Sequence, residues 1–187
     1  VLIHDPDHAF TPLLFIQVLY GHFFYTSSVI MAVPWILVIP VLILAYYGAY
    51  IFVYKNEKYK NTGNISLFIS TILILFIAFV YVNNNTLMLR PDRWLLYFTK
   101  PGGFAWNTGD ISIYPRYLHF ITGAIAIAGL SMAAYAHFSR NITNEKKESQ
   151  TEQGLKIFSI ATMVQVLIGI LFLLSLPREI MLLFLGG

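Results

Sequence analysis

The side chains best suited to chemistry in this chain are its five histidines, His4, His8, His22, His119 and His137. Histidine is costly inside a bilayer, and it is also a common axial ligand of b-type haem. The chain has no cysteine, which excludes disulfides, thiolate-bound iron–sulfur clusters and covalent c-type haem attachment. Any metal centre must therefore use histidine, methionine or carboxylate ligands.

The strongest candidate, His119, lies in the stretch "DISIYPRYLHFITGAIAIAG", residues 110–129. Arg116 comes about one helical turn before it and could pair with a haem propionate. The helical face that begins at His119 continues with Gly123, Ala126, Leu130, Ala133 and His137. Its small residues leave room for a flat macrocycle or for another backbone. The alternative is ordinary small-residue helix packing, with His119 hydrogen-bonded to a neighbouring backbone and Arg116 reaching the headgroups.

The other histidines are weaker candidates. His137 follows His119 by 18 residues, about 27 Å along a helix, so it could bind a second haem or simply lie at the opposite interface. His22, in "VLYGHFFYTSS", could lie level with His119 and share its haem, or it could anchor an interfacial helix in the headgroups.

The N-terminal run "HDPDH" combines His4 and His8 with two aspartates. It could bind a divalent metal or form a surface turn. Methionine could supply a sixth haem ligand, and we expect Met31, Met88 and Met181 towards the outer side.

The composition indicates an integral membrane protein. The hydrophobic fraction is 57% and the charged fraction 11%, and the mean hydropathy is +0.67, far above the range of soluble globular chains. The net charge of +3 comes from residues between apolar runs, so it reports membrane topology and predicts no nucleic-acid partner. The sequence begins with Val1 and shows no signal peptide, and we expect it to be a fragment of a longer chain.

Three runs are long and apolar enough to cross the hydrocarbon core as helices, which requires about 20 residues. They are Ile65–Val82, Tyr114–Phe138 and Leu155–Leu176. The polar stretch "RNITNEKKESQTEQG" between the last two is predicted to be a cytoplasmic loop.

The first apolar region, from Phe10 to Tyr54, spans 45 residues, or about 68 Å as one helix, which is too long for one span. It could be an interfacial helix over Phe10–Phe24 followed by a span from about Thr26 to Tyr54, broken at Pro34 and Pro40. It could instead be a hairpin that turns at "MAVPW". We favour the first, which gives an all-α antiparallel bundle of four transmembrane helices plus an N-terminal interfacial helix; the alternative has five spans.

Basic residues predict the orientation. One group is Lys55, Lys58 and Lys60, and the other is Arg140, Lys146, Lys147 and Lys156. Both groups fall on the same side in the four-span topology, so that side is predicted to be cytoplasmic, in a bacterial inner membrane. The connection Asn83–Asp110 then lies outside.

The three spans contain no Asp or Glu. Proton pumps and oxygen-reducing sites need protonatable groups at depth, so neither activity is expected of this chain alone. The amides available to a quinone-like carbonyl are those of Gln17, Asn83, Asn84, Asn85 and Gln165.

Two stretches, "YVNNNTLMLRPDRW" and "DISIYPRYLHFITGAIAIAGL", together resemble the large, haem-carrying subunit of cytochrome bd quinol oxidases, and more closely its divergent relatives. "PLLFIQVLYGHFFYTSSVIMAVPW" is also similar to the divergent relatives, so the resemblance covers about residues 10–138. It implies a low-spin haem b near the outer surface, with His119 as the ligand and Arg116 and Tyr117 around it. The family's quinol-binding loop and its haem-ligating glutamates are not identified here, so oxygen reduction is not carried over.

These observations predict a membrane electron-transfer subunit that binds haem b near the external face and links a quinone pool to an external cytochrome. Candidate cofactor contacts are His119, His22, Arg116, Gly123 and His137. The alternative is a haem-free structural or anchor subunit of a larger respiratory complex. A small-molecule transporter ranks last, because the sequence has no buried charge and no inverted repeat.

Overall fold

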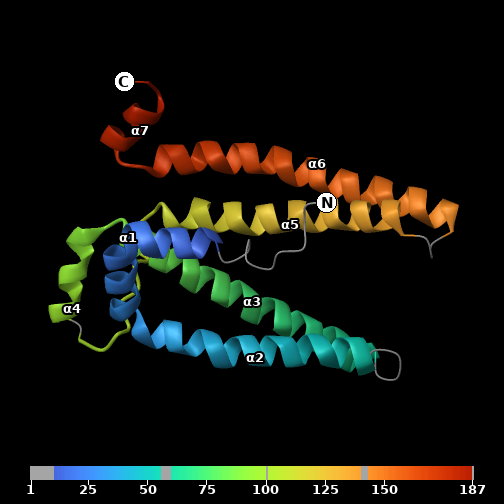
Figure 1. The fold of residues 1–187 in the computed structure, drawn as a ribbon, viewed down its shortest axis with the longest axis horizontal. Helices are drawn as coiled ribbons and strands as arrows, with labels where there is room; N and C mark the ends of the chain where they lie inside the picture. The colour runs from blue at the N-terminus through green and yellow to red at the C-terminus, as the bar shows by residue number, and fades with distance from the viewer. Residues whose placement is uncertain (1–10, 56–59, 100, 140–142, 187) are drawn as a thin grey trace. The chain divides into compact units, whose positions relative to one another are not determined.

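The computed structural model describes residues 11–55, 60–99, 101–139 and 143–186, and this described part is helical without strands. The elements are α1 (Thr11–Ile30), α2 (Ala32–Lys55), α3 (Lys60–Met88), the 3₁₀ helix η2 (Pro91–Leu95), α4 (Leu96–Thr99), α5 (Ile113–Phe138), α6 (Asn144–Ser175) and α7 (Arg178–Phe184) (Figure 1). In the described part, α2, α3, α5 and α6 are the four helices long and apolar enough to cross a membrane. The predicted all-α membrane fold with four spans is confirmed.

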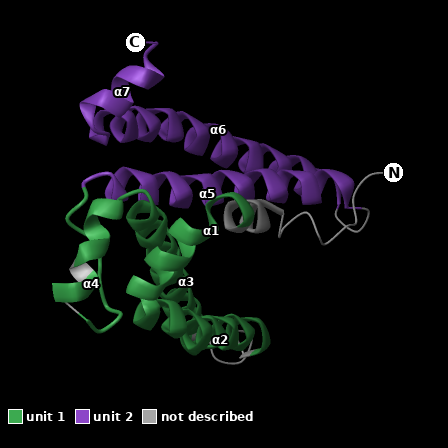
Figure 2. Ribbon diagram, turned by 60° about the vertical axis from the view of Figure 1, so that its left-hand side comes forward, with its two compact units in different colours: residues 1–110 green, residues 111–187 purple. Residues whose placement is uncertain are grey.

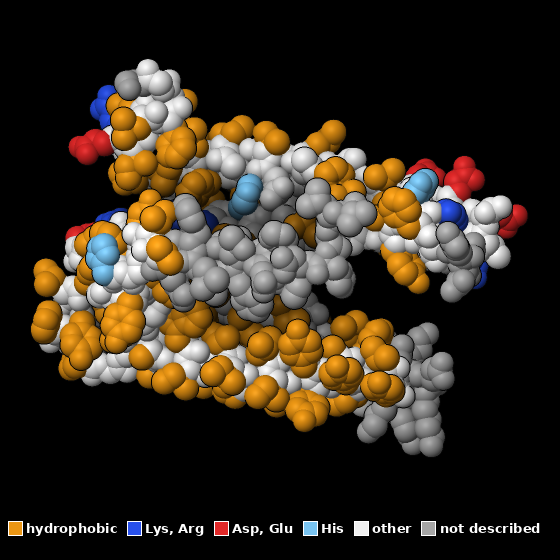
Figure 3. Space-filling model, viewed as in Figure 1, with side chains coloured by type: hydrophobic (Ala, Val, Ile, Leu, Met, Phe, Trp, Pro, Cys, Tyr) orange, Lys and Arg blue, Asp and Glu red, His pale blue; other side chains and the backbone are white. Residues whose placement is uncertain are grey.

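The chain forms two compact units, residues 1–110 and residues 111–187 (Figure 2). The first contains α1 to α4 and the second contains α5 to α7. Hydrophobic side chains cover the length of α2, whereas acidic and basic side chains gather where α6 begins (Figure 3). This distribution suits helices whose middles face lipid and whose ends face water.

The first apolar region is divided at Met31, between α1 and α2. The predicted breaks at Pro34 and Pro40 are wrong, because both prolines lie inside the continuous helix α2. Pro34 is in the first turn, where the missing N–H has no intrahelical partner to lose. The separate N-terminal helix also runs further than the predicted Phe24, to Ile30, and it is kinked at Tyr20.

The end of helix α1 meets the start of α2 at a steep angle, and α1 bends along its own length (Figure 1). It is not among the four span helices of the described part. A buried cluster of Ile30, Met31, Val80, Leu87 and Ala105 joins its end to α3. The observed arrangement is therefore the four-span alternative with a separate N-terminal helix, rather than a five-span hairpin.

Helices α2 and α3 form an antiparallel hairpin held by serine hydroxyls. Ser66 Oγ donates to the Gly48 carbonyl at 2.8 Å, and Ser70 Oγ donates to the Ala45 carbonyl. A Cβ at Gly48 would lie 2.9 Å from Ser70 Oγ. In a bilayer, the hydrophobic effect does not favour helix–helix contact over helix–lipid contact. Hydroxyl hydrogen bonds and the close approach at a glycine hold these two apolar helices together instead.

Residues 90–110, called here the 90–110 segment, dock on the break between α1 and α2. The N–H of Val33 donates to the Gly103 carbonyl at 2.9 Å, and the N–H of Ala105 donates to the Ile30 carbonyl at 3.3 Å. These bonds satisfy a carbonyl at the end of one helix and an N–H at the start of the next, groups that lack intrahelical partners. Gly103 has a φ of +64°, a backbone conformation that favours glycine.

Helices α5 and α6 form the second antiparallel hairpin, through small residues. A Cβ at Gly129 would lie 2.8 Å from the Gly154 carbonyl oxygen, and a Cβ at Gly154 would lie 2.6 Å from that of Gly129. The two backbones therefore touch at this crossing.

Helix α6 has 32 residues, or about 48 Å, which exceeds the roughly 30 Å hydrocarbon core. The prediction of a polar loop before the last span is wrong from Asn144 onwards, because the charged stretch continues the apolar helix as regular helix.

Candidate functional site

His119 is exposed on α5 and contacts a side chain of α6. Its Nε2 lies 3.4 Å from Gln165 Nε2, and the same amide nitrogen donates to the His119 carbonyl oxygen at 3.3 Å. Gln165 is a lone amide in an apolar run of α6, where polar side chains are rare and usually have a specific partner. The sequence predicted an available amide at this position, and the structure identifies the residue that it contacts.

Gly123 lies one turn after His119 and provides the space that Gln165 uses. A Cβ at Gly123 would lie 2.9 Å from Gln165 Nε2, closer than real Cβ contacts. Further along the predicted face, Ala133 lies against the Gly154 backbone of α6, whereas Leu130 and His137 are exposed. Part of the predicted face of small residues therefore packs against α6, and the rest is exposed.

Arg116 is held by an aromatic ring of α6. Its guanidinium carbon lies 4.9 Å from the centroid of the Phe172 ring, which is within cation–π range. Arg116 and His119 are three residues apart on one helical face. This face thus combines a cation with an imidazole, and α6 contacts both.

The side chains on this face of α5 offer haem iron one axial ligand. The described residues contain no group of three or more histidine, cysteine or acidic side chains that could hold a metal ion. His119 could therefore ligate a metal that brings most of its other ligands with it, as haem iron does. Arg116 provides a cation for a propionate. A flat group over Gly123 would have to displace the Gln165 amide that lies there.

His137 lies near the end of α5, with its ring 5.1 Å from that of Phe138. It borders a hollow of about 510 Å³ whose other lining residues are Asn144, Lys147, Glu148, Thr151, Glu152 and Leu155. This lining is mostly polar and charged, which suits water and ions better than an apolar macrocycle. The prediction of a second haem at His137 stays a prediction.

His22 is exposed on α1, and its ring centroid lies 3.9 Å from that of Phe23. It belongs to the first unit, whereas His119 belongs to the second. Its role as a second haem ligand stays a prediction. The "HDPDH" run with His4 and His8 lies outside the described residues, as does Gln17's side chain.

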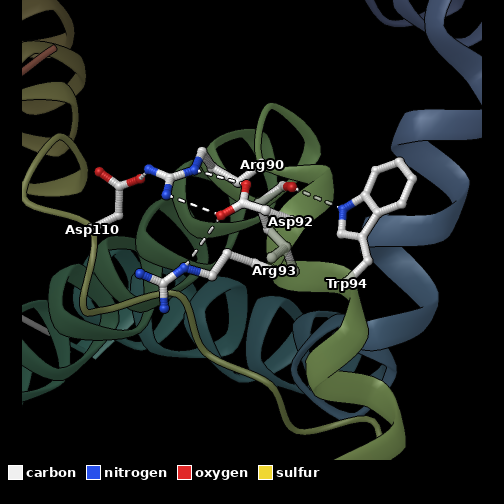
Figure 4. A network of polar contacts seen from close by, with 6 residues as sticks. Arg90, Asp92, Arg93, Trp94 and Asp110 are labelled. Atoms are coloured by element: carbon white, nitrogen blue, oxygen red, sulfur yellow. Dashed lines mark hydrogen bonds and ion pairs between the residues drawn. The ribbon is translucent and has the colours of Figure 1, made fainter. Parts of the chain in front are cut away.

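An ion network fixes the 90–110 segment of the first unit (Figure 4). Arg90 binds Asp92 through two hydrogen bonds of 3.1 Å, and its Nη1 donates to Asp110 Oδ2 at 3.0 Å. The Trp94 indole N–H donates to the Leu87 carbonyl at 3.0 Å. The hydrogen bond from Arg90 lowers the pKa of the Asp92 carboxyl, and the same bond raises the pKa of Arg90.

Buried amides lie at the end of α3 and in the 90–110 segment. Asn83 Oδ1 accepts the Asn107 backbone N–H at 2.9 Å, and Asn84 Nδ2 donates to Ser28 Oγ at 3.2 Å. Asn83 Nδ2, Asn84 Oδ1 and both side-chain polar atoms of Asn107 have no hydrogen-bond partner among the described residues. Buried amide groups are normally bonded, so the two Nδ2 atoms can donate to water or a carbonyl oxygen and the two Oδ1 atoms can accept from water.

The first unit also has an apolar pocket of about 440 Å³ between α1 and the η2–α4 region. Its lining residues are Tyr25, Thr26, Val29, Ile30, Pro91, Trp94, Leu95, Tyr97 and Phe98. None is charged and four are aromatic, which suits a ring or a lipid chain.

Comparisons of this chain with known protein families, with characterised proteins and with solved structures find no match.

Proposed function

We propose that this chain is a membrane electron-transfer subunit that binds haem b near the external face through His119 and links a quinone pool to an external cytochrome. The observation that carries the proposal is the pairing, on one face of α5, of an exposed imidazole with a guanidinium one turn away. The resemblance of residues 110–130 to the haem-carrying subunit of bd-type quinol oxidases supports the same assignment. The proposed setting is a respiratory chain in a bacterial inner membrane.

Haem, when bound, supplies one-electron redox chemistry. His119 offers a ring nitrogen as an axial ligand. Arg116 places a permanent positive charge at the N-terminal end of α5, and Phe172 limits the positions that its guanidinium can take. A fixed cation there favours the anionic propionates.

The first unit supports a quinone link. Its apolar pocket has no charged side chain and four aromatic ones, which suits a quinone ring. The lining does not select one quinone over another.

The test is a haem assay on the full chain purified from membranes. A pyridine haemochrome measurement should give stoichiometric haem b, and His119→Ala should remove or strongly shift the reduced-minus-oxidised spectrum. Thr122→Val is the matched control, because it changes a polar residue of the same helix whose hydroxyl donates to the Leu118 carbonyl of that helix at 2.7 Å. An unchanged spectrum in His119→Ala, or an equal loss in Thr122→Val, would show that the ligand assignment is wrong.

The second candidate is a haem-free anchor subunit of a larger respiratory complex. It is favoured by the close contact of Gly129 with Gly154 and by the contact of Gln165 with His119, because both account for small and polar residues in the hairpin without a cofactor. Absence of haem b from the purified protein, together with loss of complex assembly in Gly129→Val, would support this candidate instead.

A further inference from the structure

Gln165 reaches His119 from the neighbouring helix at two atoms. One is the backbone carbonyl oxygen, 3.3 Å from Gln165 Nε2, and the other is the imidazole Nε2, 3.4 Å from the same nitrogen. A carbonyl oxygen can only accept, so the Gln165 atom facing it is the NH₂ group, which has two hydrogens. One hydrogen is donated to the carbonyl oxygen, which leaves the second available to His119 Nε2 at 3.4 Å.

A donor facing Nε2 selects one form of the imidazole. Neutral histidine has its proton on Nδ1 or on Nε2, and the hydrogen bond made by each nitrogen decides between them. An N–H group opposite Nε2 disfavours a proton there and favours a lone pair. The contact at Nε2 therefore favours the Nδ1–H tautomer of His119, whose unprotonated Nε2 is able to bind a metal.

We propose that Gln165 is a positioning residue that holds His119 as the Nδ1–H tautomer, with the Nε2 lone pair ready for iron. The proposal rests on the proposed function, because the tautomer matters for iron only if His119 is the ligand. No bond is made or broken in this role, and the amide moves off Nε2 when a metal takes its place.

Gly123 provides the space that the Gln165 amide occupies beside His119. A Cβ there would lie 2.9 Å from Gln165 Nε2 and 3.9 Å from Gln165 Cδ, and no other atom would come within 4 Å. A Cβ at this position therefore requires the Gln165 amide to move from the place that it occupies beside His119. The absence of a side chain at this position thus makes room for the glutamine, in addition to any room that it leaves for a flat ligand.

The first test needs no haem. The full chain is labelled with ¹⁵N-histidine in detergent micelles at about pH 8, where an unperturbed imidazole is neutral, and the His119 ring signals are identified by their loss in His119→Ala. In the unaltered chain we expect the Nδ1–H pattern. Gln165→Met keeps the length of the side chain and removes the amide, and it should shift His119 towards the Nε2–H form. Gly123→Ala should shift it in the same direction, because the amide is pushed away.

Thr162→Val is the matched control. It removes a polar group from the same helix, but Thr162 Oγ1 donates to the Phe158 carbonyl of its own helix at 2.8 Å, so the His119 tautomer should not change. An Nε2–H pattern in the unaltered chain, or an unchanged tautomer in both Gln165→Met and Gly123→Ala, overturns the proposal.

The second test titrates haem into the haem-free chain and its variants. Apparent affinity scales with the fraction of the binding-competent form, so Gln165→Met should weaken binding roughly twofold to fivefold, by the ratio of the Nδ1–H fractions that the first test measures in the unaltered chain and in the variant. Tighter binding would make Gln165 a competitor of the iron and overturn the positioning role. If no variant binds haem while the tautomer shifts as expected, the proposed function fails and the effect of Gln165 on His119 stands.

Discussion

The guanidinium of Arg90 lies 3.0 Å from the carboxylate of Asp110, across 20 residues of sequence. The Asp110 side chain is only 10% exposed, whereas that of Asp92, the other partner of Arg90, is 59% exposed. Arg90 thus joins the end of α3 to the end of the 90–110 segment through one sheltered ion pair and one exposed ion pair. The two pairs should differ in their contributions to stability, because water screens the exposed pair more strongly.

Asp110→Asn should lower the free energy of unfolding by about 1–3 kcal/mol, because it removes a charged acceptor from a sheltered hydrogen bond. Thermal unfolding in detergent, followed by tryptophan fluorescence, measures the change. Asp92→Asn is the control and should have a smaller effect, since exposed pairs contribute about 0–1 kcal/mol. Equal effects of the two variants would contradict the role given to Asp110.

The ion network should also weaken in acid. The pKa of Asp92 is lowered in the folded chain by the hydrogen bond from Arg90. A lowered carboxyl pKa means that the folded state binds fewer protons, so its stabilising effect is present above the unfolded pKa and is lost as pH falls through the folded pKa. The melting temperature should therefore fall below about pH 4, and Asp92→Asn should make this fall smaller. An identical acid profile in the variant would exclude this contribution.

The effect of an alanine substitution on stability should depend strongly on whether the new Cβ lies at the crossing of α5 and α6. Gly154→Ala places a Cβ 2.6 Å from the Gly129 carbonyl oxygen, and overpacking of this kind costs about 1–3 kcal/mol. Gly169→Ala lies in the same helix with no atom within 4 Å of its new Cβ, so it should be neutral or stabilising by up to about 1 kcal/mol. Unfolding of the purified variants measures both. A destabilising Gly169→Ala with a neutral Gly154→Ala would contradict the packing.

Gly103→Ala should destabilise the docking of the 90–110 segment. Gly103 has a φ of +64°, and its Cβ would lie 3.2 Å from that of Ala32. A left-handed backbone costs a non-glycine residue about 1–2 kcal/mol, and the contact with Ala32 adds to this. Gly102→Ala, with no atom within 4 Å, is the control. Limited proteolysis of the segment should become faster in Gly103→Ala alone, and equal rates in both variants would refute the prediction.

Apolar run lengths were enough to predict most of the fold. The spans predicted within Ile65–Val82 and Tyr114–Phe138 lie inside α3 and α5, because a bilayer requires about 20 apolar residues in a helix. The division at Met31 falls in "MAVPW", where the alternative hairpin was expected to turn, and not at Pro34 or Pro40. It depends on Gly103 and Ala105, which provide hydrogen-bond partners for the start of α2 and the end of α1 from 70 and 75 residues further along the chain.

The candidate site, like the fold, could be predicted from the sequence only in part. His119, Arg116 and Gly123 could be grouped from helical spacing alone, since residues three or four apart share a face. Spacing within one helix says nothing about a neighbouring helix, and the contacts of Gln165 with His119 and of Phe172 with Arg116 depend on how α5 crosses α6.

The sequence by itself determined that this is a helical membrane protein with three clear spans, and it left the first apolar region open between one span and two, because hydropathy is a local property of the chain. Only the tertiary structure decided which atoms meet. The backbone contact of Gly129 with Gly154 sets how closely α6 approaches α5. That approach brings the amide of Gln165 to the ring of His119, a juxtaposition of residues 46 positions apart that no run of sequence contains.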